Sequence, residues 1–185
     1  MQDALSKRQG RPRTAIGRLL APLILSLGLT MAFLWAMGDW RTEIVAAEVR
    51  TCRVRLNDDT IDYPSVQAAV DAAQPGDVVK IAGYCTGVTS RGGLSQTIYI
   101  SKNLTLRGGY TTSWVAPNPT AYPTVLDARR EGRVLYIAGH ISSTIEGLHI
   151  TGGSATGLGG GVYSTDAAGG IYVVDATVTL RDSLV

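Results

Sequence analysis

Charged side chains able to perform catalysis gather in one short stretch of this 185-residue chain after residue 77. The stretch TVLDARREGRVL contains Asp127, Arg129, Arg130 and Glu131. Carboxylates could cleave a glycosidic bond as a pair, or bind calcium beside a basic group. The cluster lies between two β-rich segments. That position favours a solvated turn, because a site must be argued from its own geometry.

The other residues with useful chemistry do not form a recognisable metal or phosphate site. His140 and His149 have no acidic or cysteine companion at ligand spacing, which favours surface positions. The segment GLGGG at 157–161 lacks the Lys-Ser/Thr of a phosphate loop and indicates a flexible turn. The sequence therefore predicts no metal, no cofactor and no catalytic residue.

Five aromatic residues are the candidates for contact with a bound sugar: Tyr110, Trp114, Tyr122, Tyr136 and Tyr163. Trp114 and Tyr122 lie in the proline-containing loop TTSWVAPNPTAYP, residues 111–123. Aromatic rings offer large faces for contact, and the alternative is that the loop packs onto the body of the protein.

The first 47 residues have the layout of an export signal. A basic stretch precedes the uncharged run LLAPLILSLGLTMAFLWAMG, residues 19–38. Small residues in VAA at 45–47 suggest cleavage after Ala47, while the run is also long enough to remain as a membrane anchor. Both alternatives place residues 48–185 outside the cytoplasm, as an extracellular or cell-surface domain.

The exported part is near neutral and contains both cysteines. The net charge of +2 comes from the N-terminal segment, so no basic stripe remains to bind nucleic acid. In an oxidising compartment Cys52 and Cys85 are expected to form a disulfide. Two free thiols are the alternative if that compartment is not oxidising.

Three segments repeat one pattern, in which a polar break separates two short strands. They are TIYISKNLTLRGGY (97–110), VLYIAGHISSTIEGLHITGG (134–153) and GGIYVVDATVTLRDSLV (169–185). The equivalent positions Ile100, Ile137 and Val173 are 37 and 36 residues apart. A repeat of this period indicates stacked units, and the absence of a long apolar helix in each unit favours parallel strands.

Four segments carry a resemblance to a known family: YPSVQAAVDAAQPGDVVKIAGYCTG, ISKNLTLRGGY, TVLDARREGRVLYI and STIEGLHITGG. They resemble the N-terminal part of right-handed parallel β-helix proteins of the pectin-lyase-like superfamily. More narrowly, they are similar to bacterial exported proteins with repeats like those of polymorphic outer-membrane proteins. The resemblance covers about residues 50–185 and implies an all-β solenoid that continues beyond this sequence.

A short helix is expected before the first repeated strand. An apolar face from Val66 to Ala73 has helical spacing, and Pro75 ends it before a strand. A stack of repeats needs a cap at its open end. Residues 62–76, which include the helix, are predicted to form this cap. The predicted organisation is therefore a signal or anchor helix within residues 1–47, followed by a capped β-helix domain, 48–185.

Paired acids on stacked repeats must occupy equivalent positions of successive units. Glu146 and Asp182 are one repeat apart and lie next to the equivalent strand positions Ile145 and Leu180. They predict an outward-facing ladder of carboxylates, not a catalytic pair.

Two functions agree with these expectations. The first is a non-catalytic exported scaffold, structural, adhesive or carbohydrate-binding, whose partners are polysaccharides or cell-surface glycans. The alternative is a carbohydrate-active enzyme, a polysaccharide lyase or glycoside hydrolase, whose active site lies in coils outside this sequence. A membrane is a further partner through residues 19–38 if that segment is not cleaved.

Overall fold

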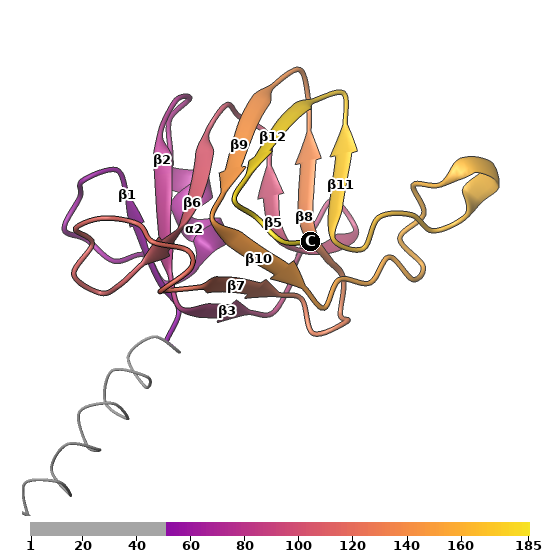
Figure 1. Cartoon of the computed structure of the whole chain (residues 1–185). Coiled ribbons are helices and arrows are strands. Elements are labelled where there is room, and N and C mark those ends of the chain that lie inside the picture. Colours follow the sequence, from indigo (N-terminus) through magenta and orange to yellow (C-terminus); the bar gives the residue numbers. More distant parts are fainter. Residues whose placement is uncertain (1–50) are drawn as a thin grey trace, which may run out of the picture. The chain divides into compact units, whose positions relative to one another are not determined.

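The computed structural model describes residues 51–185 (Figure 1). This part of the chain forms one α-helix, one 3-10 turn and twelve strands. In chain order they are β1 (Arg53–Leu56), α2 (Val66–Ala72), β2 (Val78–Ala82), β3 (Tyr84–Thr86), β4 (Thr89–Arg91), β5 (Leu94–Ile100), β6 (Thr105–Tyr110), β7 (Thr124–Asp127), β8 (Arg133–Ala138), β9 (Ser142–Glu146), β10 (Leu148–Thr151), η1 (Val162–Ser164), β11 (Ile171–Val174) and β12 (Thr177–Arg181).

The strands form three sheets, and the chain passes repeatedly from one sheet to the next. The first sheet has the order β1-β2-β6-β9-β12, the second β10-β7-β3 and the third β11-β8-β5-β4. Strands that are equivalent in successive repeats pair in parallel, for example β5 with β8 and β8 with β11. Figure 1 shows these equivalent strands side by side.

The core lies between the sheets and is built from columns of aliphatic side chains. In the third sheet Ile98 lies opposite Leu135, and Ile100 lies opposite Ile137. All four side chains are fully buried. Val173 continues the second of these columns opposite Ile137, which confirms the register predicted from the repeat spacing. Because successive side chains of a strand point to opposite faces, this register also fixes which residues face outward.

The predicted fold class, an all-β right-handed parallel β-helix, is wrong for the described part of this chain. The first and third sheets are mixed, because β1 pairs antiparallel with β2 and β4 pairs antiparallel with β5. Gly92 and Gly93, both with positive φ, form the two-residue turn between β4 and β5. This turn requires positive φ at both positions, which glycine adopts without strain. The two antiparallel strands cover edges that a uniform parallel stack would leave open.

The helix predicted over residues 19–38 lies outside the described residues. Between residues 51 and 185, no helix is long and apolar enough to cross a membrane.

The predicted short helix is confirmed as α2. Ser65 precedes it, and its hydroxyl accepts the backbone N–H of Ala68, which satisfies one of the free donors of the first turn. Gln67 accepts the N–H of Tyr99 at 2.6 Å and donates to the carbonyl of the same residue at 3.3 Å. The side chain of Gln67 thus replaces a neighbouring strand at the edge of β5, and α2 closes this end of the sheets.

The predicted disulfide between Cys52 and Cys85 is present, with a Cα–Cα distance of 4.7 Å. Cys85 belongs to β3 and is buried, while Cys52 lies just before β1 and is half-buried. The bond therefore joins the N-terminal segment to the second sheet.

Candidate recognition surface

Three tyrosines stand in one column on the outer face of the third sheet. Tyr99 of β5 lies opposite Tyr136 of β8, which lies opposite Tyr172 of β11. Each pair of neighbouring rings has its centroids 5.4 Å apart. All three residues are half-buried, because they alternate along their strands with the residues of the core. We call these three residues the tyrosine column.

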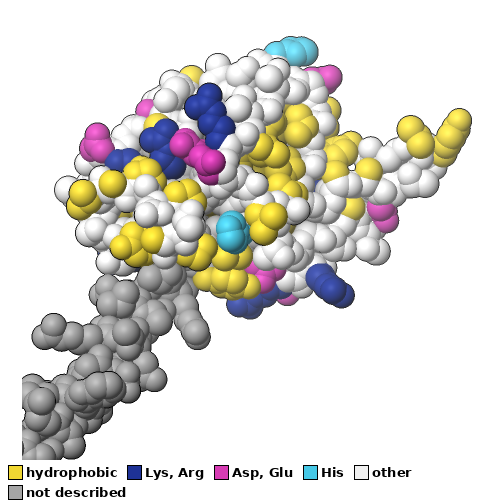
Figure 2. All heavy atoms as spheres, in the orientation of Figure 1, with side chains coloured by type: hydrophobic (Ala, Val, Ile, Leu, Met, Phe, Trp, Pro, Cys, Tyr) yellow, Lys and Arg dark blue, Asp and Glu magenta, His cyan; other side chains and the backbone are white. Residues whose placement is uncertain are grey.

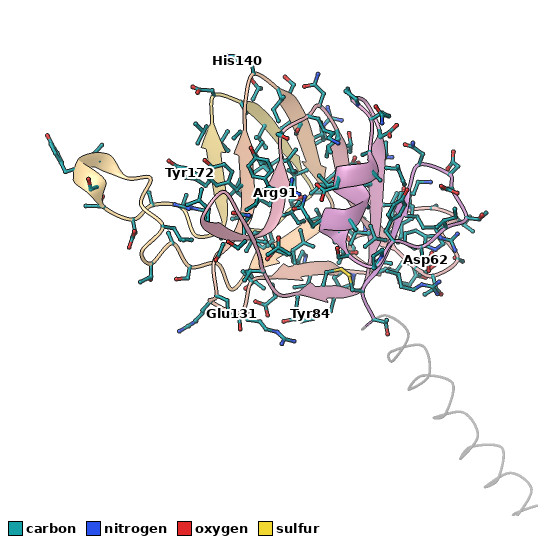
Figure 3. All side chains as sticks on the ribbon, turned by 180° about the vertical axis from the view of Figure 1, so that it is seen from behind. Asp62, Tyr84, Arg91, Glu131, His140 and Tyr172 are labelled. Atoms are coloured by element: carbon teal, nitrogen blue, oxygen red, sulfur yellow. A yellow bond between two sulfur atoms is a disulfide. The ribbon has the colours of Figure 1, made fainter. Side chains whose placement is uncertain are left out.

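An arginine covers each end of the tyrosine column. The guanidinium of Arg91 lies 5.3 Å from the ring centre of Tyr99, and that of Arg133 lies 4.3 Å from the ring centre of Tyr172. Arg91 also forms an ion pair of 2.8 Å with Asp71 on α2. A cation over an aromatic face is attracted by the negative electrostatic potential of that face. Figure 3 shows Arg91 and Tyr172 on the same side of the molecule.

Beside Tyr172 the chain forms a hairpin that projects from the body, which we call the finger (residues 157–167; Figure 1). Arg133, only 1% exposed, holds its base. Nη2 of Arg133 donates to the carbonyls of Gly159 at 2.6 Å and Ala167 at 3.2 Å. The hydroxyl of Tyr172 donates to the carbonyl of Gly160 at 3.2 Å. The finger is therefore fixed to the tyrosine column by buried and half-buried polar groups.

Asp166 organises the same loop. Its two carboxylate oxygens accept the backbone N–H groups of Gly157 and Gly159, each at 2.8 Å. These two donors, Gly157 first, hold the pKa of Asp166 below its ordinary value. The finger thus contains an acid whose ionised form is the one that stabilises it.

We expect the finger to loosen in acid. A depressed pKa means that the stabilisation is fully present above the unfolded pKa, about 3.9, and is lost as the pH falls through the lower folded value. Amide hydrogen exchange at Gly157 and Gly159, corrected for intrinsic rates, should show protection at pH 6 that declines below about pH 4. Asp166→Asn should reduce protection at pH 6 and remove the pH dependence. Equal protection of the unmodified chain at pH 6 and pH 3 would contradict the role of Asp166.

The two loop residues predicted as sugar contacts, Trp114 and Tyr122, lie outside the tyrosine column. The ring centre of Trp114 lies 5.7 Å from that of Tyr110 and 5.1 Å from the guanidinium of Arg55, so Trp114 packs within the chain. Tyr122 is half-buried, and its backbone N–H donates to the carbonyl of Asn118. The structure brings neither of them into the tyrosine column.

The two predicted stacked acids are not in register. Glu146 lies opposite Arg181, not opposite Asp182, and forms an ion pair of 2.9 Å with Arg107 on its other side. The carboxylate of Glu146 raises the pKa of Arg107. Asp182 follows β12 with positive φ and lines a surface hollow together with His149. The predicted carboxylate ladder is therefore replaced by a column of alternating charge.

The dense charged cluster forms a turn, as the sequence favoured. The carboxylate of Asp127 accepts the hydroxyl of Tyr84 and, at 2.7 Å, the backbone N–H of Arg129. These donors, Tyr84 first, lower the pKa of Asp127. Arg129 and Arg130 both have positive φ and are exposed. Asp127 therefore stabilises a turn.

The two histidines lie in different hollows. His140 is exposed and lines a polar hollow with Asn103 and Asp175, at the break between the third and first sheets. His149 lies beside Asp182. Between residues 51 and 185, no three His, Cys, Asp or Glu side chains lie close enough to hold a metal ion.

Of the tyrosine column only Tyr136 was predicted as a possible sugar contact, although a signal for the whole column was present. The spacing of Ile100, Ile137 and Val173 also holds for the residues that precede them, Tyr99, Tyr136 and Tyr172. Shifting the repeat by one position therefore finds the outward-facing column. Arg133 carries no such signal, because its role depends on the conformation of the finger.

Comparison of the chain with protein-family models, with curated proteins and with solved structures found no match. The resemblance to the pectin-lyase-like superfamily therefore gains no support, and function must be argued from the tyrosine column and the finger.

Proposed function

We propose that this protein is an exported, non-catalytic surface scaffold that binds acidic polysaccharide along the tyrosine column. The observation that carries the proposal is the column itself: three tyrosines, in register and half-exposed on one face. Neighbouring strands are about 4.8 Å apart, so a linear polymer lying across the strands meets one tyrosine after another. The face is built on strands and not on loops, so binding orders little of the backbone.

The chemistry of the column fits a ligand rich in hydroxyl and carboxylate groups. The ring faces are occupied by their neighbours and by the two arginines, so a ligand meets ring edges and phenol hydroxyls. The side chain of Arg91 is 44% exposed. Its guanidinium can therefore contact an acidic group of a ligand at the end of the column. Arginine recognises carboxylates through paired hydrogen bonds. An acidic sugar polymer offers both kinds of group.

Removal of the central ring tests the proposal. Tyr136→Ala removes both stacking contacts, and we expect it to weaken the affinity for polygalacturonate at least tenfold, equivalent to about 1.4 kcal/mol. Tyr136→Phe keeps the stacking and removes one hydroxyl, so a loss of a few fold is expected. Affinity is measured on the full chain by calorimetry, with and without calcium.

The matched control is Tyr122→Ala, which removes a half-buried tyrosine outside the column and should leave the affinity unchanged. Circular dichroism establishes that each variant is folded. Equal affinity of Tyr136→Ala and the unmodified chain would refute the assignment of the column. Turnover of the polysaccharide would refute the non-catalytic function.

A further inference from the structure

A hollow beside the Cys52–Cys85 disulfide has the properties of a binding site. This hollow of about 250 Å³ lies between the N-terminal end of α2 and the segment that joins β3 to β4. Its apolar lining includes Pro64, Val66 and Val88, and none of its lining residues is charged. We call it the disulfide hollow.

The disulfide hollow contains a polar group without a partner. Thr97 lines it and is 9% exposed, and its hydroxyl has no hydrogen bond within the described part of the chain. A buried hydroxyl that lacks a partner costs free energy, about 1–3 kcal/mol. The lining is uncharged and combines apolar and hydroxyl-bearing side chains, so an aromatic ring that ends in one hydroxyl, as in the side chain of tyrosine, suits it.

The tip of the finger presents such a side chain. Tyr163 is 98% exposed and Val162 beside it is 77% exposed. The finger end forms the hydrophobic tip of the protrusion in Figure 2. Hydrogen bonds from Thr165 N–H to the Val162 carbonyl and from Gly161 N–H to the Thr165 carbonyl close the tip. The tip itself carries no charged residue.

The backbone at the tip is strained. Tyr163 and Ser164 both have positive φ, 53° and 61°, at the two central positions of the turn. Turns of this kind favour Asn-Gly, and a bulky residue at positive φ costs on the order of 1–3 kcal/mol. A strained and fully exposed aromatic residue has no role in the stability of the isolated chain, which points to recognition.

We propose that the finger of one copy inserts Tyr163 into the disulfide hollow of a second copy, where its hydroxyl pairs with that of Thr97. Neither surface carries a charge, so the contact removes no ion from water. The finger projects away from the side that carries α2 (Figure 1), so a copy does not fill its own hollow. Joining different surfaces of identical chains head to tail produces a ring or an open chain of copies. This self-assembly goes beyond the binding of polysaccharide and does not depend on it.

Photochemical cross-linking of the full chain tests the contact. Tyr163 is replaced by p-benzoyl-L-phenylalanine, which keeps an aromatic ring at the tip and bonds to nearby C–H groups on irradiation. We expect a ladder of dimers and larger species, with cross-linked peptides that contain residues 64–67 or 84–97. The control places the same amino acid at Val115, which is 86% exposed in another loop, and should give no ladder.

Two acceptor variants identify the hollow. Val88→Trp fills it, and Thr97→Val removes only the hydroxyl. We expect the first to lower the cross-link yield at least tenfold and the second several fold, with melting temperatures close to that of the unmodified chain. A chain with the photoreactive tip and Val88→Trp, mixed with a chain carrying Tyr163→Ala, should give dimers without larger species.

Cross-links confined to one chain, to lipid or to another protein would overturn the proposal, as would a yield unaffected by both acceptor variants. Calorimetry with polygalacturonate on the same acceptor variants separates the two proposals. Loss of cross-linking with unchanged affinity is the expected result, because the hollow and the tyrosine column are different surfaces.

Discussion

Replacing Cys52 and Cys85 together by alanine is expected to lower the free energy of unfolding by about 3.7 kcal/mol, as chain entropy predicts for a loop of 33 residues. Without the bond the unfolded chain gains conformational freedom, and β1 loses its covalent link to β3. The free energy is measured by urea unfolding of the full chain. For a domain of ordinary stability this is a large fraction of the total.

The reduced form of the unmodified chain is the control for this prediction. Treatment with a thiol reductant should lower the urea midpoint by the same amount as the double substitution, and should have no effect on the substituted chain. A double variant with the midpoint of the oxidised chain would show that the disulfide does not stabilise the fold.

Arg133→Met is expected to destabilise the protein by about 2–4 kcal/mol and to release the finger. The substitution keeps an apolar chain of similar length but leaves the carbonyls of Gly159 and Ala167 without their charged donor. It also removes the cation from the face of Tyr172. Urea unfolding measures the first effect, and hydrogen exchange in residues 157–167 measures the second.

Arg133→Lys separates charge from geometry. Lysine keeps the positive charge but lacks the planar fork of donors, so it should recover only part of the lost stability. Arg181→Met is the matched control, because Arg181 is exposed and lies on another sheet. If Arg133→Met left hydrogen exchange in the finger unchanged, another contact would have to fix the finger.

The register of the parallel strands could be predicted from the sequence because a repeat fixes it. Once Ile100 and Ile137 occupy equivalent positions, the alternation of side chains along a strand determines the core and the outer face together. The helix α2 was predictable for the same reason, since its apolar spacing and the break at Pro75 are local signals. The disulfide followed from the expected oxidising compartment.

The mixed character of the sheets could not be derived from the repeats. The strands β1 and β4 precede the repeated segments, and each pairs with a neighbour in a way that no periodicity records. A local signal did exist at Gly92–Gly93, a dipeptide that favours a two-residue hairpin turn. The fold class was wrong because it extended the parallel pattern of the repeats to strands outside them.

The candidate site was only partly accessible to sequence reasoning. Tyr136 belongs to a repeated segment, and its partners follow from the repeat spacing. The finger does not, since GLGGG at 157–161 indicated only a flexible turn. Its fixed conformation depends on Arg133 and Asp166, whose hydrogen bonds to backbone groups have no sequence pattern. Contacts between a side chain and a distant backbone are visible only in the folded chain.

If polysaccharide lies on the tyrosine column, hydroxyl-radical footprinting of the full chain will detect it there. Oxidation of each tyrosine is read by mass spectrometry with and without polygalacturonate. We predict that the polymer slows the oxidation of Tyr99 and Tyr136 and leaves Tyr122 and Tyr163 unchanged. Protection confined to Tyr122, or equal oxidation of Tyr99 and Tyr136 in both samples, would contradict the claim.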